Sequence, residues 1–233
     1  SASKIAYTYI APARVSASSP TSGPVGGDTR VVVYGAQFRA GWEYLCRFGS
    51  SSVEALYVSD SQIVCTTPAL TVGEHALEVS LDSHNYTVDV LPFSVYSEPE
   101  VTVVAPTGGS ISPAGTFVVV HGPSFTSGSD YRCKFGQEVV RAVQVHDGNL
   151  TCTSPEQPSA GDLSMEVTLN GQQYSRSAVR FAYHAPHQVV SLSPSTGELA
   201  GSTRVLVRGG GFRPFDVSLC RFGGQDVKAT YVS

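Results

Sequence analysis

Hydrophobic and polar residues alternate along several short segments of this 233-residue chain. In ALEVSL (76–81) and SMEVTL (164–169), single polar residues separate the large apolar ones. A period of two is typical of a β-strand with one face in the core and the other in water. Runs of β-branched residues that end at a glycine, which are typical of buried strands, occur as RVVVYG (30–35), FVVVHG (117–122) and RVLVRG (204–209).

Turn signals and aromatic segments complete this pattern. The pair Asn170–Gly171 directly follows an alternating segment and predicts a tight hairpin turn, because both residues accept positive φ. The aromatic segments FSVY (93–96) and FAYH (181–184) are expected to form closing strands. No segment shows helical periodicity. The pattern therefore predicts an all-β protein of Greek-key β-sandwiches, with about seven short strands in each unit.

The chain repeats itself every 87 residues. The motif C-[RK]-F-G places Cys46, Cys133 and Cys220 at this spacing, and a G-x-x-F motif starts with the same spacing at Gly35, Gly122 and Gly209. A second cysteine, followed by Thr or Ser and then Pro, comes 19 residues after the first one, at Cys65 and Cys152. A fixed period of this length indicates a tandem array of small domains.

The period also predicts the domain boundaries. Residues 1–10 align with the last strand of a preceding repeat, 11–97 and 98–184 form complete repeats, and 185–233 form the first part of a truncated repeat. The joints are short and contain Pro12, Pro99 and Pro186, which are also 87 residues apart. Because proline fixes φ and favours an extended neighbour, we expect semi-rigid joints and a rod of stacked domains.

Composition and charge exclude two classes of partner. The net charge is −4 and no basic stripe is present, so a nucleic acid partner is not expected. No apolar run reaches the roughly 18–20 residues that cross a bilayer. We therefore expect membrane attachment only through parts outside this sequence.

The cysteines indicate an oxidising compartment. Spacing and repetition predict disulfides Cys46–Cys65 and Cys133–Cys152, with buried free thiols as the alternative. No CxxC motif or Cys/His cluster suggests a zinc site. For Cys220 we expect a partner beyond the given sequence, at the position that the period assigns to 239, rather than a reactive free thiol.

Two N-glycosylation sequons agree with a secretory location. NYT places Asn85 in a turn-like segment, and NLT places Asn149 after a second one. We expect both asparagines to carry glycans if the protein is secreted. The alternative is that both are ordinary turn residues.

No set of residues suggests catalysis, and no cofactor is expected. Tyr34 has His121 and Arg208 as its counterparts in the other repeats, a variation that a catalytic group would not tolerate. His184 and His187 at the last joint form at most a weak metal site, and a solvated linker is the preferred interpretation. The acidic residues of the turns form no cluster like that of a calcium-binding loop. A calcium ion at the joints stays an open alternative.

These motifs together resemble the IPT/TIG domain, an immunoglobulin-like module of plexins, Met-type receptor tyrosine kinases and fibrocystin-like surface proteins. The resemblance is carried by the order PTSGP, GGDTRVVVYGAQF, CRFG, CTTP, an alternating strand and a closing aromatic strand, and it covers the whole chain. The second copy departs from it in PTGGSISPAGTF, where Ser and Pro replace a Gly-Gly or Ala-Gly turn. Rel-type transcription factors carry a similar domain, but the paired cysteines, sequons and acidic balance point away from that branch.

The resemblance implies an extracellular or cell-surface location and does not identify a ligand. The leading hypothesis is a non-enzymatic structural and adhesive segment whose partners are other protein chains, further repeats, glycans or matrix. A second hypothesis is the stalk of a signalling receptor ectodomain. A third and weaker hypothesis is a carbohydrate-binding accessory module of a secreted enzyme.

Overall fold

A computed structural model describes residues 12–39, 43–112, 115–123, 125–145, 148–214 and 218–232. The segment 1–10, expected as a strand of a preceding repeat, lies outside these ranges. The described residues form twenty β-strands and no α-helix, so the predicted all-β class is confirmed. The domain boundaries stay a prediction. We use repeat 1, repeat 2 and repeat 3 for residues 12–97, 98–184 and 185–232.

Repeat 1 is a β-sandwich of eight strands, one more than the approximate number expected from the sequence. Their order is β1-β3-β6-β5-β4-β7-β8-β2, and the pairs are antiparallel except for β2 and β8, which are parallel. The strands are β1 (Arg14–Ser19), β2 (Ser22–Pro24), β3 (Arg30–Ala36), β4 (Leu45–Phe48), β5 (Ser51–Ser59), β6 (Gln62–Thr66), β7 (Gly73–Ser80) and β8 (Leu91–Tyr96).

Repeat 2 has the same architecture. Its strand order, β10-β16-β15-β12-β13-β14-β11-β9, reads as that of repeat 1 in reverse, and β10 again runs parallel to the last strand. The strands are β9 (Val103–Ala105), β10 (Gly108–Ser110), β11 (Phe117–His121), β12 (Arg132–Phe135), β13 (Glu138–Gln144), β14 (Leu150–Thr153), β15 (Gly161–Thr168) and β16 (Val179–His184).

One long strand connects the two layers of each sandwich. In repeat 1, residues 51–54 of β5 pair with β4, whereas residues 55–59 pair with β6 in the other layer. β13 does the same in repeat 2, between β12 and β14. The apolar residues of the alternating segments point into the space between the layers, since Leu77, Val79, Met165 and Val167 are all buried.

The motif C-[RK]-F-G alternates between the core and the surface. Cys46 and Phe48 are fully buried, and the Phe48 ring packs edge-on against Phe93 at 5.2 Å between centroids. Arg47 points outward, donates to Glu78 at 2.7 Å and lies over the Tyr86 ring. The closing glycine, Gly49, has φ +59° and makes the turn into the next strand.

The motif G-x-x-F marks a site where a ring packs directly on the backbone. Phe38 and Phe125 are fully buried, each against the glycine three residues earlier. A Cβ at Gly35 or Gly122 would collide with that ring and with a backbone carbonyl oxygen of the neighbouring strand. Close packing therefore explains why glycine recurs at this position with the period of the repeat.

Repeat 3 consists of two antiparallel strand pairs. The equivalent of the buried Phe48 is Phe222, which is 46% exposed; among the described residues β19 pairs with β20 alone, whereas β4 also pairs with β7. The strands are β17 (Gln188–Ser193), β18 (Leu206–Gly210), β19 (Ser218–Phe222) and β20 (Gln225–Ala229).

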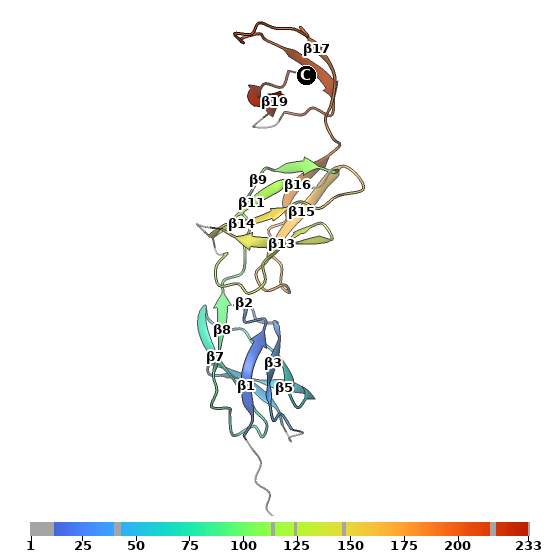
Figure 1. The fold of residues 1–233 in the computed structure, drawn as a ribbon. Helices are drawn as coiled ribbons and strands as arrows, with labels where there is room; N and C mark the ends of the chain where they lie inside the picture. Colours follow the sequence, from blue (N-terminus) through green and yellow to red (C-terminus); the bar gives the residue numbers. More distant parts are fainter. Residues whose placement is uncertain are drawn as a thin grey trace, which may run out of the picture.

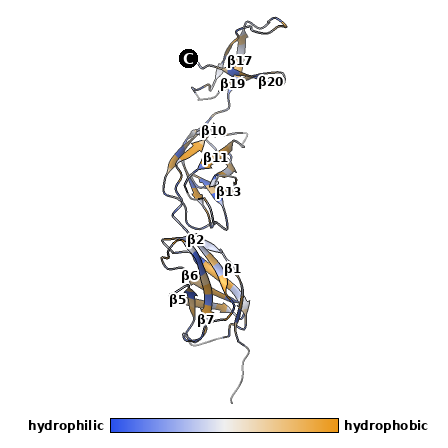
Figure 2. Cartoon of the chain, turned by 90° about the vertical axis from the view of Figure 1, so that its left-hand side faces the viewer, coloured by the Kyte–Doolittle hydropathy of each residue, from blue (hydrophilic) through white to orange (hydrophobic). Residues whose placement is uncertain are grey.

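The three repeats follow one another end to end (Figure 1). Figure 2 shows the same elongated arrangement after a quarter turn, with hydrophobic segments concentrated in the strands of repeats 1 and 2. No helix among the described residues has the length and apolar character of a membrane span.

Candidate functional site

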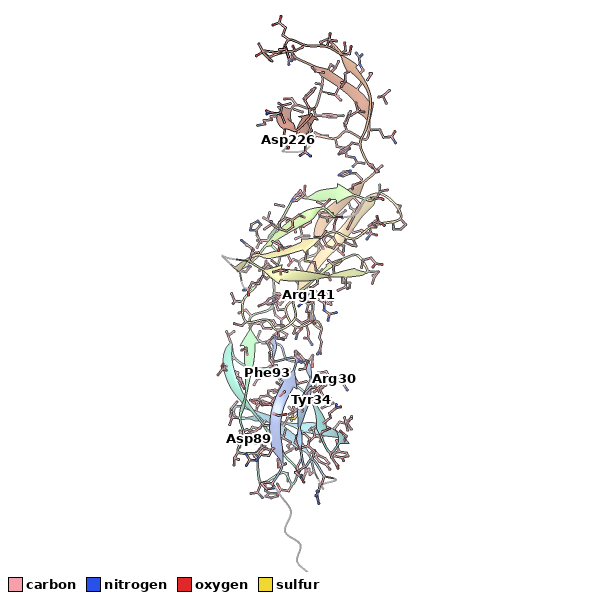
Figure 3. All side chains as sticks on the ribbon, in the orientation of Figure 1. Arg30, Tyr34, Asp89, Phe93, Arg141 and Asp226 are labelled. Carbon is pink, nitrogen blue, oxygen red and sulfur yellow. A yellow bond between two sulfur atoms is a disulfide. The ribbon has the colours of Figure 1, made fainter. Side chains whose placement is uncertain are left out.

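The contact between repeat 1 and repeat 2, which we call the first joint, is built from polar loops. The β15–β16 loop, residues 169–178, lies against the end of repeat 1 that is formed by Ser22 and by residues 28–30. Figure 3 labels Arg30 in the upper part of repeat 1, towards repeat 2. Among the described residues, eight hydrogen bonds cross this joint: the seven described below and one from the Gly26 N–H to Glu98 Oε1 at 3.3 Å.

Asn170 is the central residue of the first joint and is only 3% exposed. Its Oδ1 atom accepts hydrogen bonds from the backbone N–H groups of Gln172 and Gln173, which shapes the loop. Its Nδ2 atom donates across the joint to the Ser22 carbonyl oxygen at 3.4 Å and to Thr29 Oγ1 at 3.2 Å. Nδ2 also donates within the loop, to Gln173 Oε1 at 2.7 Å, so the amide donates both locally and between domains.

Two glutamines extend this contact along the backbone of repeat 1. Gln172 accepts from the Arg30 N–H and donates to the Arg30 carbonyl oxygen, both at 2.9 Å, as a neighbouring strand would. Gln173 donates to the Asp28 carbonyl oxygen at 2.7 Å and accepts from Thr29 Oγ1 at 3.1 Å. The Ser22 hydroxyl donates to Ser129 Oγ at 2.9 Å. These bonds fix the orientation of the two repeats about several axes.

Apolar packing also continues through the first joint. Tyr96, at the end of β8, is buried in the hydrophobic cluster of repeat 2 together with Val101 and Phe125. Burial, reinforced by the charge of Glu98 and by Tyr131, raises the pKa of the Tyr96 hydroxyl. This hydroxyl has no hydrogen-bond partner among the described residues. The last strand of repeat 1 therefore contributes a core side chain to repeat 2.

The position of Asn170 corrects one expectation. The pair Asn170–Gly171 was expected to form a tight hairpin turn, but β15 ends at Thr168 and β16 starts only at Val179. Gly171 does have positive φ, at +75°. The pair opens a longer loop because Asn170 pairs sideways with Asp130 in an isolated parallel bridge and reaches repeat 1, so tertiary contacts replace the two-residue turn.

Repeat 1 carries the equivalent loop with different chemistry. Asp82 occupies the place of Asn170, and its carboxylate accepts hydrogen bonds from the N–H groups of His84 and Asn85 and from Asn85 Nδ2. These bonds, those from Asn85 first, hold the pKa of Asp82 far below its usual range. A carboxylate has no N–H to donate, so this loop lacks the donor that Asn170 provides at the first joint.

The second joint, between repeat 2 and repeat 3, uses aromatic rings. His184 and His187 stack with 4.7 Å between ring centroids, and His187 also lies 5.9 Å from the Phe212 ring. His187 Nδ1 is 2.8 Å from the Gly211 carbonyl oxygen, which makes a hydrogen bond in the tautomer protonated at Nδ1. The sequence marked these histidines as a weak metal site at most, and the structure instead stacks them between repeats.

The paired cysteines join the two layers of each sandwich. Disulfides connect Cys46 of β4 with Cys65 of β6, and Cys133 of β12 with Cys152 of β14. The Cα atoms are 6.2 Å and 6.5 Å apart, and all four side chains are buried. Cys220 is a half-buried free thiol, and its partner at a position outside this sequence stays a prediction.

The two sequon asparagines lie in different surroundings. Asn85 is exposed in the polar loop of Asp82, where its Nδ2 atom donates to that carboxylate at 2.8 Å. Asn149 is half-buried just before β14, and its Oδ1 atom lies 3.0 Å from Nδ1 of His121 on β11. Whether either asparagine carries a glycan stays a prediction.

The described residues bring together no group of three or more His, Cys, Asp or Glu side chains that could hold a metal ion. Tyr34 and His121 occupy equivalent outward positions on β3 and β11. The arrangement of the first joint is suited to holding two domains in a fixed orientation. Sequence reasoning located the joint by its proline but missed the loop that forms it.

Comparisons with known proteins agree with this architecture. The family model described as "IPT/TIG domain" matches residues 13–95 and 99–183. The chain is 26% identical over 213 residues to Fibrocystin-L of Mus musculus, an alignment that covers 91% of the chain and 5% of that protein. It is 26% identical over 155 residues to Plexin-A3 of Homo sapiens, covering 64% of the chain and 8% of that protein.

A solved structure shares the fold. The extracellular region of Plexin A4, domains 1 to 10, superimposes with a TM-score of 0.57 at 18% sequence identity, covering 92% of this chain and 19% of that one. The chain thus spans only a small part of the relatives that it matches.

Proposed function

The chain belongs to the IPT/TIG domain family, and from this membership we propose that it is a non-enzymatic structural segment of a large extracellular or cell-surface protein. Its repeats hold a fixed spacing and orientation, and their outer surfaces serve protein–protein assembly and adhesion. The partners in this proposal are other protein chains or further repeats of the same protein, with glycans or matrix as additional candidates.

The observation that carries this proposal is the first joint. Two independent domains connected only by a linker would be expected to move relative to one another. Here buried Asn170 donates across the joint, Gln172 pairs with both backbone groups of Arg30, and Tyr96 enters the core of the next repeat. A joint of this kind makes repeats 1 and 2 one mechanical unit.

The extracellular part of the proposal rests on chemistry and on relatives. Two buried disulfides are characteristic of proteins that mature in an oxidising compartment. The solved Plexin A4 structure is described as an extracellular region. Both observations support a secretory location for this segment.

Asn170→Asp tests the rigid joint. The substitution replaces the Nδ2 donor with an oxygen that faces the Ser22 carbonyl oxygen, so we expect the joint to lose about 1–3 kcal/mol at neutral pH. Small-angle X-ray scattering of the whole chain should then show a broader distribution of interatomic distances. Hydrogen exchange should become faster in residues 22–30 and in the β15–β16 loop.

Asp82→Asn is the matched control for this experiment. It makes the reverse exchange at the equivalent position of repeat 1, in the loop that lies away from the first joint, and should leave the scattering profile unchanged. If wild type and Asn170→Asp gave the same broad distribution, the two repeats would move independently and the rigid-segment proposal would fail.

A second candidate function is the stalk of a signalling receptor ectodomain. The similarity to Plexin-A3 over 155 residues favours it. In this case the repeats would position a separate ligand-binding domain rather than form adhesive contacts themselves. A membrane span followed by a cytoplasmic signalling domain in the full-length protein would support the stalk. Direct binding of isolated repeats to matrix or to other chains would support the adhesive segment.

A further inference from the structure

One layer of repeat 2 has an apolar outer face. On the sheet β9–β11–β14–β13, Val103, Phe117 and Val143 point away from the core and are 53%, 61% and 60% exposed. The register places them among small uncharged neighbours: Ala105 opposes Val119, and Thr151 opposes both Val119 and Val143. Residues opposed in antiparallel strands share a face. Val103, Phe117 and Val143 therefore lie exposed on one face of this sheet, which we call the apolar face.

The equivalent face of repeat 1 has an arginine at the place of Phe117, while Leu56, which is 65% exposed, takes the place of Val143. Ala17 opposes Tyr34 in repeat 1 and Val103 opposes His121 in repeat 2, so Ala17 is the equivalent of Val103. Arg30 is the equivalent of Phe117, because each begins its strand at the same distance before Tyr34 or His121. An exposed apolar face on a soluble domain is normally covered by a partner. A group that covers the apolar face of repeat 2 is therefore expected.

A sequon lies at the corner of the apolar face. Asn149 precedes β14, and its Oδ1 atom lies 3.0 Å from Nδ1 of His121, the residue that opposes Val103. This contact holds the Asn149 amide beside the outer end of β11. Repeat 1 has Gln62 at the equivalent place, so a sequon at this corner occurs in the repeat that has Phe117 where the other has Arg30.

We propose that an N-linked glycan on Asn149 lies across the apolar face of repeat 2 and shields it from other protein chains. The first sugars of such a glycan present C–H faces that pack on Val and Phe side chains, while their hydroxyl groups point to water. Glycans are bulky and solubilising on protein surfaces. This inference rests on the proposed function, because N-glycosylation requires passage through the secretory pathway.

The test uses the whole chain secreted from mammalian cells, with Asn149→Gln compared with Asn85→Gln. Each variant removes one sequon. Asn85 lies in the polar loop of Asp82, so its loss serves as the control. We expect Asn149→Gln alone to increase self-association in sedimentation velocity and to increase the fluorescence of a dye that binds apolar surfaces. Hydrogen exchange of repeat 2 checks that the variant is folded.

A double variant tests the cause. Phe117→Arg introduces the residue that repeat 1 has at this position, so Asn149→Gln with Phe117→Arg should return the chain towards the monomeric profile. Two results would overturn the inference: secreted wild type with a glycan on Asn85 and none on Asn149, or a folded Asn149→Gln chain that behaves as wild type. Failure of the chain to receive a glycan at either asparagine would instead count against the extracellular location in the proposed function.

Discussion

Single side chains decide how the repeats meet. Asn170 and Asp82 occupy equivalent loop positions, and both satisfy the N–H groups of their own loop through a side-chain oxygen. They differ in the remaining atom. The Nδ2 donor of Asn170 reaches repeat 1, whereas the second oxygen of Asp82 binds Asn85 within its own loop. One atom at the same loop position thus makes different hydrogen bonds in the two repeats.

Tyr96 provides a residue-scale prediction. Its ring is buried in repeat 2 and its hydroxyl has no partner among the described residues. Tyr96→Phe removes an unpaired buried hydroxyl, so we expect the stability of repeat 2 to stay within about 1 kcal/mol of wild type or to increase. Tyr96→Ala removes the ring and should cost about 3 kcal/mol. Native-state hydrogen exchange of β15 and β16 measures both. Equal losses in the two variants would show that the hydroxyl does have a partner.

At the scale of the strand, each sandwich depends on ties between its two layers. β5 and β13 connect the layers through the backbone, and the disulfides Cys46–Cys65 and Cys133–Cys152 connect them through the core. The edge-on ring pairs, such as Phe135 with Phe181 at 5.1 Å between centroids, connect strands of the same layer. Their rings fill the space between the two layers. A small domain with a limited core needs such covalent support.

Removal of one disulfide tests this role. Cys133→Ala with Cys152→Ala opens a loop of about 20 residues and should lower the free energy of unfolding of repeat 2 by about 3 kcal/mol. Cys220→Ala is the control, because Cys220 forms no disulfide in this chain. Thermal unfolding without reductant should show an earlier transition only for the double variant. If both variants unfolded as wild type does, the disulfide would not limit the stability of repeat 2.

At the scale of the whole molecule, the described strands of repeat 3 are less buried than those of repeats 1 and 2. Repeats 1 and 2 each have two layers, a buried disulfide and a shared joint. Repeat 3 has two strand pairs with Leu206, Leu219 and Phe222 exposed by 41%, 57% and 46%. Isolated two-stranded pairs are marginally stable in water. Repeats 1 and 2, in contrast, are connected by the hydrogen bonds of Asn170 and Gln172 and by the buried ring of Tyr96.

Hydrogen exchange of the intact chain tests this difference. We expect the strand amides of repeats 1 and 2 to be protected together and those of β18, β19 and β20 to exchange much faster, because local opening there exposes little additional apolar surface. The two complete repeats serve as the internal reference. Equal protection in all three repeats would show that repeat 3 is stabilised by contacts that the present structure does not contain.

The sequence by itself determined the strands, the repeat and the cysteine pairing. These features depend on the local alternation of apolar and polar residues and on glycine and phenylalanine at fixed spacing. They also depend on a fixed period, which identifies equivalent positions in successive repeats. The buried glycines of the G-x-x-F motif are an example, since Gly35 and Gly122 recur for the same steric reason.

Only the tertiary structure decided how the domains meet and which faces stay exposed. The bond from Asn170 to Ser22 joins residues 148 positions apart, and no local pattern distinguishes a loop that docks from a loop that turns. The Asn-Gly pair indicated a tight turn because its backbone preference is local, whereas the docking depends on the shape and unpaired backbone groups of another domain. The apolar face of repeat 2 became visible for the same reason, because strand order decides which outward residues become neighbours.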